Sequence, residues 1–139
     1  MAALTHGEAQ DLIERYKRAW ELRDPDLAME LYRDDAEFRL DPFEEPARGA
    51  NEIRAIWTDL AATQVHVQFD AERVWAVERT VLTSWHAAFT RRSNAERVRI
   101  RGFSTFELDD AGLIQRAKQW AAARVVGLDS TLRPQQEEN

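Results

Sequence analysis

The chain has 139 residues and no cysteine, which excludes a disulfide scaffold, a thiolate metal site and a cysteine nucleophile. Its 25 acidic and 19 basic residues leave a net charge of −6, whereas a nucleic-acid-binding surface needs a basic face. No apolar run approaches the roughly 20 residues that span a bilayer, and the N-terminus lacks the features of a signal peptide. We therefore expect a cytoplasmic protein with no nucleic-acid or membrane partner.

Two helices are predicted near the N-terminus. Thr5 and Glu8 fit a capping box, in which each side chain satisfies a free backbone amide. Behind them apolar residues recur at spacings of three and four and form one stripe: Ala9, Leu12, Ile13, Tyr16, Ala19 and Trp20. Asp24 and Pro25 then fit the N-cap and the first position of a short second helix. Its inner face is predicted to hold Leu27, Ala28 and Leu31.

A short strand over residues 36–40 is predicted next, followed by a loop over residues 41–46 that contains two prolines. Gly49 and Asn51 open a third helix, whose apolar positions again follow the helical period: Ile53, Ile56, Trp57 and Leu60.

From Val65 onward the apolar period changes to two, which predicts four strands near residues 65–77, 81–91, 97–108 and 113–123. Turn-forming residues separate the later strands. Helices followed by an antiparallel meander are typical of an α+β fold, with the helices on one face of the sheet. We expect one domain over residues 1–133 and a polar, frayed tail over residues 134–139.

The order of these elements resembles the nuclear transport factor 2-like superfamily, in particular its SnoaL-like and ketosteroid isomerase-like branch. Two stretches carry the resemblance, one over residues 14–57, with Tyr16 and the Asp41-Pro42 pair, and one over residues 102–114. The resemblance covers residues 6–123. It implies a cone-shaped, curved antiparallel sheet wrapped around three N-terminal helices, an apolar pocket at the open end, and a homodimer formed through the outer face of the sheet.

Tyr16 matches the position at which ketosteroid isomerases place a tyrosine that donates a hydrogen bond to the developing oxyanion. A buried, preorganised phenol stabilises an enolate without ionising itself. The alternative is that Tyr16 is only a residue of the apolar stripe, with its hydroxyl at the pocket rim or on a backbone carbonyl.

Asp41 resembles the aspartate that shuttles the proton in the isomerases, where an Asp-Pro pair ends the first strand. The match requires one inserted residue, which a β-bulge can absorb. Without the insertion Leu40 takes the position of the base, and leucine cannot move a proton. The alternative for Asp41 is an Asx or Asp-Pro turn.

Two other family features are changed in this chain. Ser104 stands where the isomerases carry a protonated aspartate as a second oxyanion donor, and a serine is the weaker stabiliser. Many cyclases of the family carry an aspartate after the last aromatic residue, but Trp120 is followed by three alanines. The Asp/Arg/Asp arrangement by which related epoxide hydrolases activate water is also not found.

His86 is a further candidate, because an imidazole in the middle of a strand can act as a general base near neutral pH. Strand alternation places it on the face opposite Trp85 and Phe89. If those two aromatic residues face the cone, His86 faces the dimer interface. If they pack outward, His86 enters the pocket, and the sequence leaves both arrangements open.

For the pocket wall we predict large apolar residues with few polar atoms, namely Phe38, Leu40, Trp57, Leu60, Phe103, Ser104 and Trp120. Histidines are scattered without metal-ligand spacing, and there is no glycine-rich phosphate loop, so we expect no metal and no cofactor. Arg97, Arg99 and Arg101 alternate with apolar residues, which favours a solvated or dimer-bridging face over an anion site.

Two kinds of function remain open for a pocket that takes an apolar or aromatic small molecule. The first is an isomerase or cyclase that acts through an enolate, with Tyr16 donating to the oxyanion and Asp41 or His86 moving the proton. The alternative is a non-catalytic ligand-binding or dimerisation module. An acid or imidazole within hydrogen-bond reach of Tyr16 would favour chemistry, and an otherwise apolar cone would favour binding.

Overall fold

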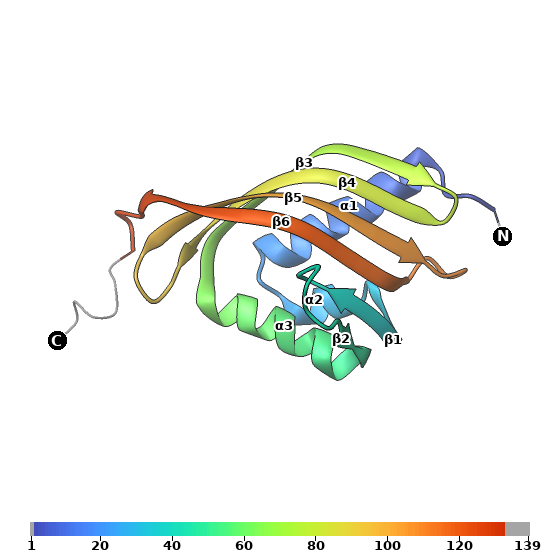
Figure 1. Ribbon diagram of the computed structural model, residues 1–139, viewed down its shortest axis with the longest axis horizontal. Helices are drawn as coiled ribbons and strands as arrows, with labels where there is room; N and C mark the ends of the chain where they lie inside the picture. The colour runs from blue at the N-terminus through green and yellow to red at the C-terminus, as the bar shows by residue number, and fades with distance from the viewer. Residues whose placement is uncertain (1, 133–139) are drawn as a thin grey trace.

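The computed structural model describes residues 2–132, and the tail predicted over residues 134–139 lies outside the described residues. The described part of the chain forms three helices and one six-stranded sheet (Figure 1): α1 His6–Glu21, α2 Pro25–Met29, β1 Tyr32–Arg39, β2 Ala47–Arg48, α3 Gly49–Thr63, β3 Gln64–Val77, β4 Thr80–Arg91, β5 Glu96–Leu108 and β6 Ile114–Leu128. The predicted α+β class with three helices and a curved sheet is confirmed.

The N-terminal caps form as predicted. The Glu8 amide donates to Thr5 Oγ1 over 3.1 Å, and the Thr5 amide donates to Glu8 Oε1 over 2.9 Å. These hydrogen bonds hold the pKa of the Glu8 carboxyl below its usual value. Asp24 accepts from two amides of α2, with Pro25 as the first helical residue. The predicted apolar stripe of α1 is buried along its whole length.

The strands follow the order β2-β1-β6-β5-β4-β3, and β3 to β6 form the predicted antiparallel meander. β1 departs from the expectation of a wholly antiparallel sheet, because it pairs with β6 in parallel. Alternation of apolar and polar residues fixes the faces of a strand but not the direction of its neighbour. β1 also begins at Tyr32 rather than Ala36, and β6 extends to Leu128.

The helices lie on one face of the sheet, and the core lies between them and that face (Figure 1). Phe69, Trp85 and Phe106 point into this core from β3, β4 and β5. The Trp85 ring covers Gly102 of β5, because a Cβ at Gly102 would lie 2.3 Å from that ring. We call the helix-facing side the inner face and the opposite side the outer face.

The far end of β6 continues past the helical layer, and its residues from Trp120 to Leu128 are exposed (Figure 1). None of the helices within residues 2–132 combines the length and the apolar character needed to cross a membrane.

Candidate functional site

Tyr16 lies inside the cone, where aromatic rings from four elements surround it. Its ring centroid is 5.4 Å from Trp57 of α3, 5.3 Å from Phe106 of β5 and 5.7 Å from Phe69 of β3. Trp20, one turn further along α1, lies 6.4 Å away. Burial raises the pKa of Tyr16 and is the single cause of that rise, so the phenol remains a neutral hydroxyl near physiological pH.

A second buried phenol belongs to the same interior. Burial raises the pKa of Tyr32 well above its usual value; the neighbouring Tyr16 adds to the rise and the Trp57 indole opposes it. The Tyr32 hydroxyl and the Trp57 Nε1 are nevertheless both buried without a hydrogen-bond partner in the described part of the chain. Such groups cost free energy until something accepts their protons. Together Tyr16, Tyr32 and Trp57 form what we call the interior donor cluster.

A groove of about 550 Å³ opens between the end of β1 and α3. Its apolar wall includes Phe38, Leu40 and Ile56, and Phe38 is almost fully buried at 2% exposed. The Phe38 ring stacks on Tyr32, with centroids 6.0 Å apart and planes at 27°. Phe38 therefore lines the groove and also contacts Tyr32 of the interior donor cluster, while none of the three cluster residues lines the groove itself.

Asp41 lies on the wall of this groove, but its carboxylate is used in a turn. Its Oδ1 accepts from the Phe43 amide over 2.9 Å, and its carbonyl accepts from the Glu44 amide over 3.1 Å. This is the Asx turn that the sequence left open as the alternative. Asp41 is exposed, and Leu40 beside it is 38% exposed.

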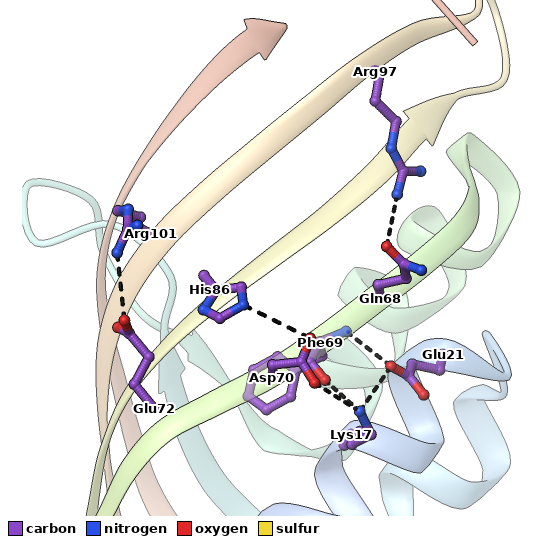
Figure 2. Close-up of polar contacts among 9 residues, drawn as sticks. All are labelled: Lys17, Glu21, Gln68, Phe69, Asp70, Glu72, His86, Arg97 and Arg101. Carbon is purple, nitrogen blue, oxygen red and sulfur yellow. Dashed lines mark hydrogen bonds and ion pairs between the residues drawn. The ribbon is translucent and has the colours of Figure 1, made fainter. Parts of the chain in front are cut away.

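The structure settles the face that His86 takes. Trp85 and Phe89 are buried at 2% and 8% exposed, so His86 lies on the outer face. His86 Nε2 lies 3.7 Å from Asp70 Oδ2 on the neighbouring β3 (Figure 2). The thickness of the sheet thus separates this imidazole from Tyr16.

Asp70 connects His86 to the first helix rather than to the interior. Asp70 Oδ1 lies 3.4 Å from Lys17 Nζ, and Lys17 also donates to the Phe69 carbonyl over 2.6 Å (Figure 2). The Glu21 carboxylate also contacts Lys17, with Oε2 3.2 Å from Nζ. The same oxygen accepts a hydrogen bond from the Phe69 amide. Partial burial lowers the pKa of Lys17, but the Glu21 and Asp70 carboxylates outweigh it and leave that pKa raised.

Of the residues predicted for the pocket wall, Ser104 lies on the inner face of the sheet and Leu60 lies on α3. Ser104 is buried, and its Oγ accepts from the Trp85 indole over 2.9 Å. The serine therefore positions Trp85 in this structure, while its own hydroxyl proton is free to be donated. Leu60 is half-buried against the core from α3.

Phe103 and Trp120 lie elsewhere than predicted. They are opposite each other on β5 and β6, on the face away from Ser104, and their ring centroids are 6.5 Å apart. Trp120 is 43% exposed. Both side chains are therefore on the outer face and do not line the interior, because residues next to each other in a strand point to opposite faces.

The three proposed catalytic residues do not meet. Tyr16 is inside, Asp41 is in a turn at the rim, and His86 is outside. Sequence analysis missed Tyr32 as a site residue, although it belongs to the stretch that carries the family resemblance. Its position as the first inner-facing residue of β1 was the available signal, but the strand was predicted to begin later.

Comparison with known proteins adds a family and three related folds. A family model described as a SnoaL-like domain matches residues 13–117, and no curated protein matches the sequence. The epoxide hydrolase/cyclase-like enzyme SalBIII, described for pyran ring formation in the polyether salinomycin, has a TM-score of 0.77. It is 16% identical over 86% of this chain and 97% of its own.

Two further structures share the fold. An LEH-like epoxide hydrolase of M. tuberculosis has a TM-score of 0.71 at 20% identity, covering 84% of each chain. A hypothetical protein from Catenulispora acidiphila with a ketosteroid isomerase-like fold, in complex with trimethylamine, has a TM-score of 0.69 at 11% identity. It covers 78% of this chain and 83% of its own. These findings confirm the resemblance predicted from the sequence.

Proposed function

Since this chain belongs to the SnoaL-like domain family, we propose that it binds an apolar or aromatic small molecule inside the cone and does not transform it. The ligand enters by the groove beside Phe38 and presents a hydrogen-bond acceptor, such as a carbonyl oxygen, to the interior donor cluster. A groove of about 550 Å³ is in the size range of small-molecule sites.

One observation carries this proposal: the Tyr32 hydroxyl and the Trp57 Nε1 are buried donors without a hydrogen-bond partner among residues 2–132. A bound acceptor oxygen would satisfy them, and the neutral Tyr16 phenol beside them could add a third hydrogen bond. These neutral donors are sufficient to bind a neutral acceptor, because binding requires no group that takes up a proton.

Catalysis through an enolate needs a proton acceptor next to the oxyanion donors. Asp41 holds its carboxylate in a turn, and His86 is on the other side of the sheet. Within residues 2–132 no carboxylate or imidazole contributes to the pKa of Tyr16. The isomerase or cyclase hypothesis is therefore the less supported of the two.

Binding can be tested with 2-acetylnaphthalene, a flat aromatic ketone, against 2-isopropenylnaphthalene, which has nearly the same shape without the oxygen. We expect the ketone to bind about tenfold more tightly, because its oxygen gives buried donors a partner. In Tyr32→Phe most of that preference should disappear, as measured by NMR titration. Equal binding of the two compounds to the wild-type protein would refute the role of the donors.

The same ketone separates binding from enolate chemistry. Its acetyl protons exchange with deuterium only through an enol or enolate, so we expect the protein to leave the exchange rate in D₂O at the buffer value. Accelerated exchange that Tyr16→Phe slows by about a hundredfold, the usual loss for one oxyanion donor, would support the enzyme instead.

We also propose that a second copy of the chain packs on the aromatic half of the outer face. Phe103 packs between Trp75 and Trp120 there, and Trp120 is 43% exposed. Exposed aromatic clusters of this kind are typical of protein interfaces. Sedimentation equilibrium should show that the wild-type protein is a dimer and that Trp120→Glu weakens the dimer. A wild-type protein that is monomeric at all concentrations would refute this proposal.

A further inference from the structure

The groove between the end of β1 and α3 combines an apolar wall with a one-sided charge. Phe38, Leu40 and Ile56 supply most of its apolar surface. Four of its ten lining residues carry a carboxylate, namely Asp41, Glu44, Glu45 and Glu52. Among the described residues, no lysine, arginine or histidine lines it. A cavity of this composition selects the charge of its occupant as well as the shape.

Most of this negative charge is not neutralised by the protein itself. Glu45 lies 3.5 Å from Arg48, but both side chains are more than half exposed, so this pair is weak. Within residues 2–132, Asp41, Glu44 and Glu52 form no ion pair at all. Like charges around one cavity repel each other, and a cation placed among them removes that repulsion.

The local structure fixes these carboxylates without using all of their oxygens. Asp41 Oδ1 accepts from the Phe43 amide over 2.9 Å, and Glu52 Oε1 accepts from the Arg48 amide over 2.9 Å. The second oxygen of each, and both carboxylate oxygens of Glu44, accept no hydrogen bond in the part of the chain that the structure describes. An ammonium group carries three N–H donors and no acceptor, which matches a site of free acceptors.

Two observations besides the charge point to a ligand at this end of the cone. Phe38, which lines the groove, stacks on Tyr32, whose hydroxyl is buried without a partner among residues 2–132. Phe43 is 95% exposed on the turn between Asp41 and Glu44, two residues that line the groove. An uncovered aromatic ring attracts a cation through its face.

We propose that the small molecule bound in this groove is a cation, namely an apolar or aromatic amine that is protonated at neutral pH. Its apolar body lies against the apolar wall, and its ammonium group donates to the carboxylates of Asp41, Glu44 and Glu52. Burial of the apolar body supplies affinity, and the carboxylates select positive charge. This inference rests on the proposed function in one respect, that the groove takes a small molecule, and it adds the charge of that molecule.

The groove does not depend on a free outer face. It is bounded by α3 and by the inner-facing Phe38 of β1, whereas Trp75, Phe103 and Trp120 of the aromatic half belong to β3, β5 and β6. A second copy packed on the aromatic half therefore leaves the groove open.

The test uses 2-naphthylmethylamine as probe, which is an ammonium ion at neutral pH. 2-Naphthalenemethanol has the same ring without charge, 2-naphthoate has the opposite charge, and methylammonium has the charge without the ring. NMR titration of the wild-type protein should shift the amides of residues 38–47 and 52–56. We expect the amine to bind about tenfold more tightly than the alcohol or methylammonium, and 2-naphthoate to bind more weakly than the alcohol. Added salt should reduce the preference for the amine.

Asp41→Asn, Glu44→Gln and Glu52→Gln each replace a carboxylate by an amide of the same shape, whose oxygen can still accept the local hydrogen bond. Each should weaken binding of the amine about threefold, as expected for one exposed charge pair, and leave binding of the alcohol unchanged. The triple variant should bind both compounds equally. Glu14→Gln is the control, because Glu14 is exposed on α1 and the substitution changes the net charge equally.

Three results would overturn the proposal. One is equal affinity of the wild-type protein for the amine and the alcohol. Another is a loss in Glu14→Gln as large as that in Glu44→Gln. The third is a triple variant that binds the amine normally and changes only the oligomeric state, since a basic surface of a second copy would then occupy the groove.

The result is distinguishable from that of the ketone test. None of these probes carries a ketone, so Tyr32→Phe should leave the preference for the amine unchanged. If the ketone shows no preference over its hydrocarbon, the role of the interior donor cluster fails. If the amine shows no preference over the alcohol, only the charge of the ligand fails.

Discussion

The two faces of the sheet are made by the same strands, yet they carry opposite chemistry. The inner face presents aromatic rings and a few neutral donors, such as Trp85 and Ser104. The outer face presents charge, with Arg99, Arg101 and His86 next to exposed aromatic rings. Alternation along each strand produces this division, because neighbouring residues point to opposite sides.

The difference separates the two kinds of group that an enolate mechanism would need. A neutral donor and a proton acceptor must share one side of the sheet to act on one ligand. Here Tyr16 is inside and His86 is on the outer face, so neither face brings the pair together. Five experiments can break or sharpen this comparison.

The largest effect is expected from removing an inner-face ring. Trp85→Ala should lower the free energy of unfolding by about 3–5 kcal/mol, because it leaves a cavity and removes the hydrogen bond to Ser104. Trp120→Ala on the outer face should cost less than about 1 kcal/mol, since that ring is 43% exposed. Urea denaturation measures both, and equal losses would erase the distinction between the faces.

Gly102→Ala should lower the free energy of unfolding by about 1–3 kcal/mol, the usual cost of overpacking. The added methyl group would collide with the Trp85 ring at 2.3 Å. The control is Gly7→Ala on α1, where the methyl group would meet only Thr5 Oγ1 at 3.9 Å. That substitution should not destabilise the protein. If Gly102→Ala left the free energy of unfolding unchanged, the Trp85 ring would have to be able to move aside.

Alkaline titration tests both tyrosines of the chain at once, since it has only two and both are buried in the core. Burial raises the pKa of Tyr16 and of Tyr32 in the folded protein above their unfolded values near 10. The stability that depends on their neutral forms is thus complete below about pH 10 and declines above it. Tyrosinate absorbance should appear only together with unfolding, and titration of a folded tyrosine near pH 10 would contradict their burial.

Tyr32→Phe should raise the free energy of unfolding by about 1 kcal/mol in the ligand-free protein, because it removes a buried hydroxyl that finds no hydrogen-bond partner in the part of the chain that the structure describes. The same substitution should weaken binding of the ketone probe. Higher stability with weaker binding is the signature of a residue kept for its ligand. A destabilised variant would show that the hydroxyl is satisfied in the folded protein.

The smallest effect is expected on the outer face. Arg101→Gln removes an ion pair with Glu72 in which the arginine side chain is 73% exposed. Exposed pairs contribute little, so the free energy of unfolding should change by less than about 0.5 kcal/mol. A loss of 2 kcal/mol or more would show that the outer charges hold the fold together.

Much of the architecture could be predicted because it depends on local features. Thr5 and Glu8 identified the start of α1, and the spacing of three and four identified its buried stripe. The four meander strands were placed to within a few residues at their starts. Ser104 and Trp57, two of the residues predicted to line a pocket, are buried.

Other features depend on partners far away in the sequence. The parallel pairing of β1 with β6 and the turn at Asp41 are examples, and so is the outward position of Trp120. The opposition of Arg99 and Arg124 follows from the register of β5 and β6. The residues next to each of these features in the sequence do not indicate which distant partner it meets.

By itself, the sequence determined the helices, the strands and which residues of a strand share a face, because capping, helical period and alternation are local properties of the chain. It could not determine which of the two faces the helices would cover, since alternation relates residues only to one another. Packing of α1 against β3, β4 and β5, and of α3 against β1, made that choice. With it, the structure turned Tyr16, Tyr32 and Trp57 inward together and left the arginines outside.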